Sequence, residues 1–369
     1  MAMEKNTRLL SLDTLRGFDM MFIMGVAEII VMICALFPGG ETCWLASQMH
    51  HAKWSGLLHH DTIFPLFLFI AGISFPFSYA KQLSNGRTRG QIYKKIITRG
   101  ITLVLLGFVV NGITFLKLDH FRFYSVLARI GLAWMFAALL FINFKPRTRV
   151  IISITILIGY WLLLRFVPAP DCPTGNPFSR EGNLIGYIDR CIMPNHLLSP
   201  GVFGPEGLLS LLPAIVTAML GMFTGEFVRS EKYSGNQKTG YMLLAAVLML
   251  AAGLLWSLDF PINKKMWTST FVLVVGSYSL AMFAIFYYII DVRGWKRWTK
   301  FFEVIGKNSI TIYLAQCFIP FGAIAKYFLG AAAELCPPQV GELILAVGAF
   351  AAAWLFLYFL YKKNTFLKV

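Results

Sequence analysis

The chain has 369 residues, of which 57% are hydrophobic and only 14% are charged, whereas an average soluble domain carries about 25% charged residues. These proportions exclude a soluble enzyme, a disordered chain and a small disulfide-rich scaffold. The formal net charge of +15 leaves two explanations open, a nucleic-acid partner or the basic face of a membrane protein.

The hydrophobic residues are gathered into runs about as long as a helix that crosses ~30 Å of hydrocarbon, and no long alternating pattern suggests a barrel. We therefore predict an all-α, polytopic membrane protein in which residues 1–369 form a single domain with about ten transmembrane helices. In chain order, the expected helices lie near residues 18–37, 61–80, 98–116, 125–144, 149–168, 207–227, 239–257, 268–290, 303–328 and 341–361.

The basic residues predict how the chain is oriented. An even number of spans leaves both termini on one side, and about two thirds of the 33 Lys and Arg residues fall in the ends and loops of that side. Because cytoplasmic loops carry an excess of Lys and Arg, both termini are expected in the cytoplasm. Topology then explains the net charge. We expect surrounding membrane lipid and no nucleic-acid partner.

Two long segments on the opposite, outer side, residues 38–60 and 169–206, are expected to form the mouth of a binding site, because long loops often carry function. The six histidines and four of the six cysteines fall on this side. These four thiols allow three pairings, and free thiols are equally open. They are Cys43, Cys172, Cys191 and Cys336.

The stretch from His50 to Asp61 places two pairs of histidines and a carboxylate directly before an apolar helix. Asp61 is suited to capping that helix. Adjacent histidines do not match a usual zinc spacing, so we predict no metal site. The remaining interpretation is a histidine that acts as general base or nucleophile and is oriented by a carboxylate. Trp54 in the same stretch is suited to an interfacial anchor or to a contact with substrate.

Cations near the cytoplasmic entrance indicate a site for an anionic ligand. Arg8 and Arg16 are eight residues apart and share one face of a helix, although Arg16 is also placed to pair with Asp13. Arg129 and Lys307 lie inside predicted spans, where a cation is costly unless it faces a partner or a wet cavity. Asn308 and Ser309 follow Lys307 and are suited either to this site or to contacts between helices.

Short blocks along the chain resemble the heparan-α-glucosaminide N-acetyltransferase family, in the family's own order. The blocks are SLDTLRG at 11–17, HAKWSG at 51–56, DTIFP at 61–65, YIDR at 187–190, PEG at 205–207, PINK at 261–264 with Trp267, and Asp291 followed by Asn308 and Ser309. The resemblance implies a multi-helix membrane acetyltransferase that takes acetyl-CoA from the cytoplasm and acetylates the amine of a terminal glucosamine on the far side. The form GFDM at 17–20 resembles a bacterial branch, which implies the bacterial inner membrane and allows a homodimer.

The resemblance identifies His51 as the active histidine. We expect His51 to act as general base or to accept the acetyl group itself, with Asp61 orienting its ring and Asn263 donating to the developing oxyanion. The CoA phosphates are expected at Arg8, Arg16, Arg129 and Lys307, beside Asn308 and Ser309. The amino-sugar or glycan acceptor is expected at Trp54, Asp189, Glu206, Lys264 and Trp267.

Two other functions stay open at this point. One is an O-acetyltransferase that modifies a hydroxyl group of a cell-surface glycan. The other is a transporter of a small molecule or a lipid-linked sugar, although the sequence shows no inverted repeat or pair of broken helices of the kind that transporters use.

Overall fold

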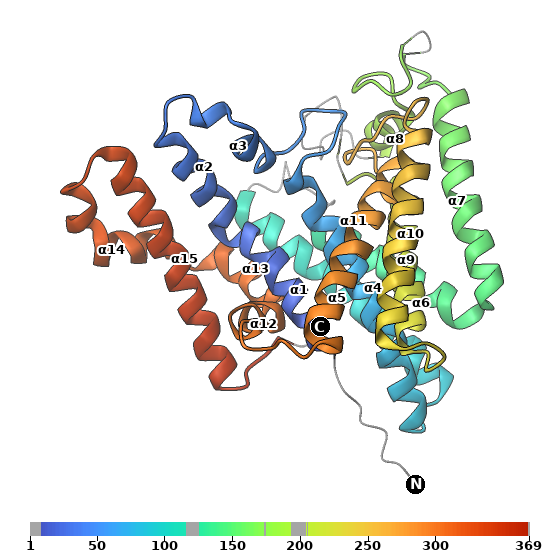
Figure 1. The fold of residues 1–369 in the computed structure, drawn as a ribbon. Coiled ribbons are helices and arrows are strands. Elements are labelled where there is room, and N and C mark those ends of the chain that lie inside the picture. Colours follow the sequence, from blue (N-terminus) through green and yellow to red (C-terminus); the bar gives the residue numbers. More distant parts are fainter. Residues whose placement is uncertain (1–8, 116–124, 173–174, 193–203, 205, 368–369) are drawn as a thin grey trace. The chain divides into compact units, whose positions relative to one another are not determined.

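The computed structural model describes the chain except for residues 1–8, 116–124, 173–174, 193–203, 205 and 368–369 (Figure 1). Arg8, one of the residues expected to bind a phosphate, lies outside the described part. Within the described part the secondary structure is helical, and its one isolated β-bridge joins Gly56 to Asn263. The prediction of an all-α protein is confirmed.

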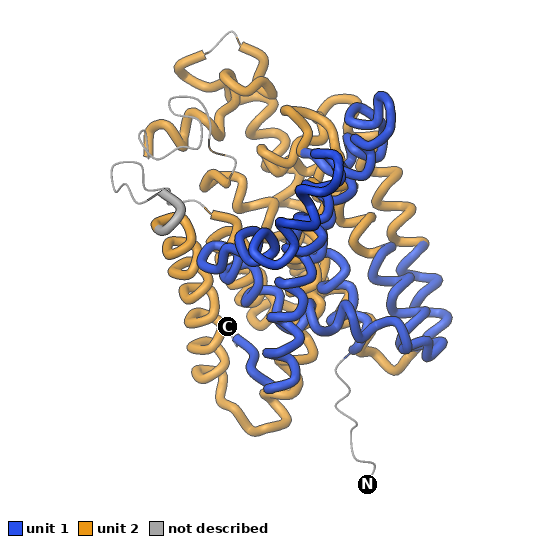
Figure 2. Tube along the Cα trace, turned by 90° about the vertical axis from the view of Figure 1, so that its left-hand side faces the viewer, with its two compact units in different colours: residues 1–50, 233–243, 281–368 blue, residues 51–232, 244–280, 369 orange. Residues whose placement is uncertain are grey.

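The chain divides into two compact units, each made of segments that are far apart in the sequence (Figure 2). Unit 1 contains residues 1–50, 233–243 and 281–368, and unit 2 contains residues 51–232 and 244–280. The expectation of one membrane domain over residues 1–369 stays a prediction.

Unit 2 is built around α4, which packs against α6 and α9. Apolar side chains from these helices form a closed core, and Trp134 of α6 donates its indole N–H to the carbonyl oxygen of Ala71, 3.3 Å away. Ser125 caps α6 by accepting from the backbone N–H of Ala128. The helices wholly in unit 2 are α4 (His59–Ser84), α5 (Arg89–Phe115), α6 (Val126–Asn143), α7 (Pro146–Phe166), α8 (Leu184–Ile192) and α9 (Leu211–Arg229).

Unit 1 is held by a close contact between α1 (Leu10–Met21) and α12 (Thr299–Lys307). A Cβ atom added at Gly17 would lie 1.8 Å from the carbonyl oxygen of Phe302, so the two backbones approach as only small residues permit. The other helices wholly in unit 1 are α2 (Ala27–Ala35), α3 (Trp44–Gln48), α13 (Ser309–Phe318), α14 (Phe321–Glu334) and α15 (Pro338–Lys362), and a π-helical turn (Phe22–Val26) joins α1 to α2. The helices α10 (Gly235–Trp256) and α11 (Ser269–Tyr287) have residues in both units.

Nine helical segments of the described chain are long and apolar enough to cross a membrane, and up to ten if a bent pair counts as one span. This agrees with the predicted number of about ten, and in the structure the span expected near 303–328 is divided among α12, α13 and α14. Helix α12 ends at Lys307. The chain then bends by 71° between α13 and α14. Pro320 stands at the bend, where it lacks a backbone N–H and disfavours a helical conformation in the preceding residue. The first span also begins earlier than predicted, at Leu10.

The six cysteines are free thiols in the structure. The sequence left free thiols and disulfides equally open for the four on the outer side, and the structure shows the first.

Candidate active site

The site begins at the amino end of α4, where Asp61 ties down the loop before the helix. Asp61 is buried, and its Oδ2 accepts from the backbone N–H groups of Ala52 at 3.1 Å and Leu58 at 3.2 Å. The expected capping role is therefore present, but α4 starts at His59 with Leu58 as its N-cap, so Asp61 caps from the third helical position. One carboxylate oxygen thus fixes both ends of the segment between Ala52 and Leu58.

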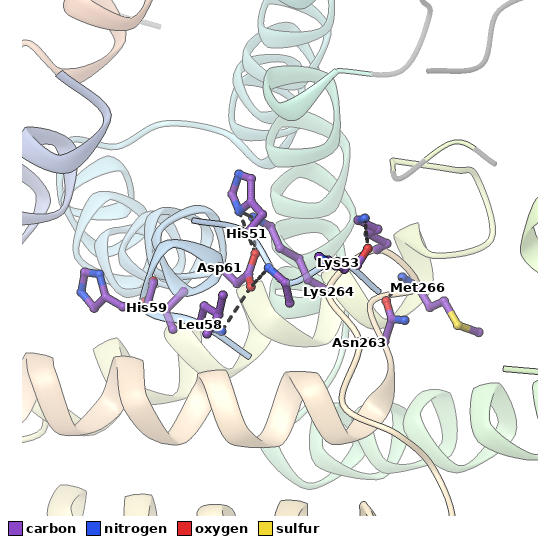
Figure 3. A network of polar contacts seen from close by, with 11 residues as sticks. His51, Lys53, Leu58, His59, Asp61, Asn263, Lys264 and Met266 are labelled. Atoms are coloured by element: carbon purple, nitrogen blue, oxygen red, sulfur yellow. Dashed lines mark hydrogen bonds and ion pairs between the residues drawn. The ribbon is translucent and has the colours of Figure 1, made fainter. Parts of the chain in front are cut away.

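The other oxygen of Asp61 holds His51. The Nδ1 atom of His51 lies 2.8 Å from Asp61 Oδ1, and the two side chains are 56% and 2% exposed (Figure 3). Because an ionised carboxylate only accepts hydrogen bonds, this contact requires a proton on Nδ1, and a neutral His51 ring then has its lone pair on Nε2. The structure therefore joins the two residues predicted for the catalytic pair, with the ring of the histidine accessible.

Lys264 completes this group from the loop between α10 and α11. Its Nζ lies 3.2 Å from Asp61 Oδ1 and 3.2 Å from His51 Nδ1. Burial lowers the pKa of Lys264 below its usual value, and the charge of Asp61 opposes that shift. The sequence motif marked Lys264 as a contact for the acceptor and gave no indication that it touches the catalytic pair.

Two further histidines, to which the sequence assigned no role, lie next to Asp61 in the first turn of α4. The ring of His60 packs edge-on against His51 with ring centres 4.6 Å apart, and Nε2 of His59 lies 3.4 Å from the hydroxyl of Tyr278. The signal available in the sequence was their position next to Asp61 in the first turn of α4.

The loop that carries Lys264 is fixed by Asn263, which is completely buried. Its backbone N–H donates to Thr268 Oγ1 at 3.1 Å, and its Oδ1 accepts from the N–H of Met266 at 3.0 Å. Within the described structure its Nδ2 is buried without a hydrogen-bond partner. The amide therefore has an unused donor beside the residue that contacts His51.

Trp267 anchors this loop in the core. It adopts a left-handed backbone conformation with φ of 51° and is completely buried. Its indole N–H donates to Thr217 Oγ1 at 3.1 Å, and its ring packs on Phe64. The structure thus places Trp267, expected to contact the acceptor, inside the core.

Arg129, which the sequence grouped with the phosphate-binding cations, lies in unit 2. Its guanidinium donates to the hydroxyl of Ser210 and lies 4.9 Å above the ring of Trp267. Asp189 contacts the same segment before α9, because its Oδ1 accepts from the backbone N–H of Leu208 at 3.2 Å. Arg129 and Asp189 therefore both hold the short segment before α9.

Glu206 acts on Lys264 through its charge. The negative charge of Glu206 raises the pKa of Lys264 and so opposes the fall that burial causes. The indole N–H of Trp54 donates to the carbonyl oxygen of Phe178 at 2.7 Å. This hydrogen bond joins the two outer segments that the sequence predicted as one mouth. The ammonium of Lys265 also lies 5.9 Å from the ring of Trp54.

The remaining residues expected at the donor site, apart from Arg8, are in unit 1. Arg16 Nη1 lies 3.5 Å from Asp13 Oδ1, as the spacing predicted, and Lys307 Nζ lies 2.5 Å from Glu303 Oε1. The two cations stand on α1 and α12, the helices that meet at Gly17. Asn308 and Ser309 follow at the junction of α12 and α13, and both are buried.

Known proteins show the same relationship that the short blocks indicated. Residues 8–252 match the family model of the heparan-alpha-glucosaminide N-acetyltransferase catalytic region. The chain is 28% identical to the heparan-alpha-glucosaminide N-acetyltransferase of Homo sapiens, over 84% of this chain and 52% of that protein, and 28% identical to that of Mus musculus, over 98% and 60%. It therefore spans little more than half the length of these relatives. Since the matched region covers well over half of the chain, this protein belongs to the heparan-α-glucosaminide N-acetyltransferase family.

Proposed function

We propose that this protein transfers an acetyl group from acetyl-CoA, bound from the cytoplasmic side of a bacterial inner membrane, to the amine of a glucosamine-type sugar on the opposite side. Family membership supports acyl transfer, and the names of the relatives support a glucosamine amine as acceptor. The observation that carries the proposal is the hydrogen bond between His51 and buried Asp61. It gives a reachable imidazole the tautomer that a base or nucleophile needs.

The chemistry follows from that tautomer. In the direct route the acceptor nitrogen attacks the thioester carbon, its proton passes to Nε2 of His51, and the C–S bond breaks to release CoA as thiolate. In the covalent route Nε2 attacks first and the thiolate leaves; the amine then takes the acetyl group from the imidazole, and the proton that the amine loses passes to the freed Nε2. In both routes Asp61 stabilises the positive charge that develops on the ring.

Asn263 is suited to stabilising the oxyanion. The thioester oxygen gains negative charge in either route, and a preorganised donor at that point lowers the barrier. The unused Nδ2 of Asn263 would supply such a donor, and the hydrogen bond from the N–H of Met266 to Oδ1 fixes which way the amide faces. Asn263 therefore keeps its predicted role in the proposal.

The remaining candidate residues are divided between the binding site for acetyl-CoA and the binding site for the acceptor sugar. Arg16 and Lys307, with Asn308 and Ser309 beside them, would bind the phosphates of CoA, which carry several negative charges and cannot enter hydrocarbon. Trp54, Asp189, Glu206 and Trp267 would shape the acceptor side. The sequence placed Arg129 with the phosphate-binding residues. We assign it to the acceptor side instead, because it contacts Ser210 and Trp267.

The proposal is tested with purified protein in lipid nanodiscs, acetyl-CoA and three acceptors, namely glucosamine, glucosamine-terminated oligosaccharides and peptidoglycan fragments. Mass spectrometry with fragmentation locates the acetyl group on nitrogen or oxygen. N-acetylated product with the wild type and none with His51→Ala supports the proposal. O-acetylated product would indicate a hydroxyl acceptor instead, and CoA binding without any product would contradict acetyl transfer.

A second experiment separates the two routes. Wild-type protein is mixed with acetyl-labelled CoA in the absence of acceptor and then digested. Label on the peptide that contains His51 indicates the covalent route, whereas unlabelled protein that still transfers acetyl groups when acceptor is added indicates the direct route.

A further inference from the structure

Lys264 contacts both members of the catalytic pair and forms a closed triangle with them. Its Nζ is 3.2 Å from Asp61 Oδ1 and 3.2 Å from His51 Nδ1, and these two atoms are 2.8 Å apart. Asp61 Oδ1 thus accepts from the ring N–H and from the ammonium, while Oδ2 accepts from two backbone N–H groups. Each polar atom of the carboxylate is used, so Asp61 has the contacts of an ionised group.

The two charges in this triangle act on the His51 ring in opposite directions. A carboxylate alone beside an imidazole favours the imidazolium form, whereas a cation at similar distance disfavours it. Ionised Asp61 and protonated Lys264 carry no net charge together. A neutral ring is what the chemistry needs, because an imidazolium has no lone pair to offer.

We propose that Lys264 is a positioning residue whose ammonium group offsets the charge of Asp61 and keeps His51 neutral, with its proton on Nδ1. This inference rests on the proposed function and gives Lys264 a role beyond contact with the acceptor. Among the described residues, His60 is a further titratable group that faces His51, because its ring packs on it. The pKa of Lys264 is in turn raised by the negative charge of Glu206 and lowered by the positive charge of Arg129.

The fold fixes the backbone before Lys264, whereas the side chain of the next residue, Lys265, makes a different contact. Asn263 is bonded within its own loop and bridged to Gly56, so the backbone before Lys264 is fixed. The ammonium of Lys265 donates instead to the carbonyl oxygen of Lys53. Lys265 is therefore a matched control, since it has the same side chain and the same loop but no hydrogen bond to the pair among the described contacts.

The test measures the protonation of His51 without turnover. Diethyl pyrocarbonate reacts with neutral imidazole, and peptide mass spectrometry reports the modification of His51 as a function of pH. In Lys264→Met we expect the midpoint to move to higher pH by about one unit, which makes the reaction about tenfold slower at pH values below both midpoints. Lys264→Arg and Lys265→Met should keep the wild-type profile. Lys264→Gln provides a second neutral side chain if the methionine variant fails to fold.

A Lys264→Met or Lys264→Gln profile that superimposes on the wild type overturns the proposal. So does a rise in the acceptor KM alone, which is what simple contact with the acceptor would produce. Acetyl transfer is measured on the same samples. If the profile shifts but the wild type transfers no acetyl group, the proposed function fails and the role of Lys264 in the triangle stands.

Discussion

The backbone N–H of Gly56 donates to the carbonyl oxygen of Ile262 across 2.8 Å. This hydrogen bond and the bridge between Gly56 and Asn263 join the loop after His51 to the loop that carries Lys264. The ammonium and the imidazole that meet there are 213 residues apart in the sequence. The site therefore depends on contacts between two loops that are far apart in the sequence.

Gly56→Ala should loosen that contact. Gly56 has φ of 112°, where a residue with a Cβ is strained by about 1–3 kcal/mol, although a Cβ would meet no neighbouring atom. We expect a lower melting temperature and at least about tenfold slower acetyl transfer. Gly159→Ala is the control, because it lies inside α7 with nothing near its Cβ and should not be destabilised. Equal melting temperatures and rates for both variants would contradict the role given to Gly56.

His51→Gln should abolish transfer and leave donor binding intact. The imidazole is the only group in the proposal that takes the proton or the acetyl group, and such groups contribute about 10²–10⁴-fold to rate. Calorimetry with CoA and single-turnover kinetics check the two parts. His50→Gln is the control, because His50 is exposed next to it in sequence. Wild-type turnover in His51→Gln would remove His51 from the mechanism.

Asp61→Asn should cost both activity and stability. An amide has one acceptor oxygen where the carboxylate uses two, so either the backbone N–H groups of Ala52 and Leu58 or the His51 ring loses its partner. Leaving a buried donor unsatisfied costs about 1–3 kcal/mol, and loss of the orienting carboxylate should slow transfer at least about a hundredfold. Thermal unfolding and kcat are the measurements. A variant with wild-type kcat would show that Asp61 only caps α4.

The titration of Lys264 should respond to the same substitution. Burial lowers its pKa and the charge of Asp61 raises it, so removing that charge should lower the pKa further. In the wild type the ammonium is present below this lowered pKa and is lost as pH rises through it. NMR titration of lysine Nζ, with the Lys264 signal assigned by Lys264→Arg, checks both values. A higher pKa for Lys264 in Asp61→Asn would contradict the described contact.

Arg16→Ala should weaken CoA binding by about tenfold, the loss expected for one charge-assisted contact to phosphate, and the effect should shrink at high salt. Lys307→Ala should behave alike. Arg147→Ala is the control, since Arg147 is exposed at the start of α7. Affinities measured by calorimetry at two salt concentrations decide the matter, and an unchanged Kd in both site variants would place the phosphates elsewhere.

Sequence reasoning predicted the helices better than their breaks. Hydrophobic runs fix where helices lie because the cost of exposing backbone in lipid applies along the whole segment. Pro320 was a sequence signal for the bend. A continuous apolar run, however, does not show at which residue a helix ends. Asp61 was correctly expected to cap α4 and to face a histidine, yet its position within the first turn depended on the loop that folds back from Ala52.

Length, composition and the order of short motifs by themselves determined an all-helical membrane protein of this acetyltransferase family and singled out His51 and Asp61. These properties are local, because hydrophobic runs and motifs are written in consecutive residues. Only the tertiary structure decided that Lys264 touches both His51 and Asp61, that His60 packs on His51, that Arg129 lies with Ser210 and Trp267, and that Trp267 is buried. Such contacts join residues far apart in sequence, and backbone hydrogen bonds such as that between Gly56 and Ile262 set them.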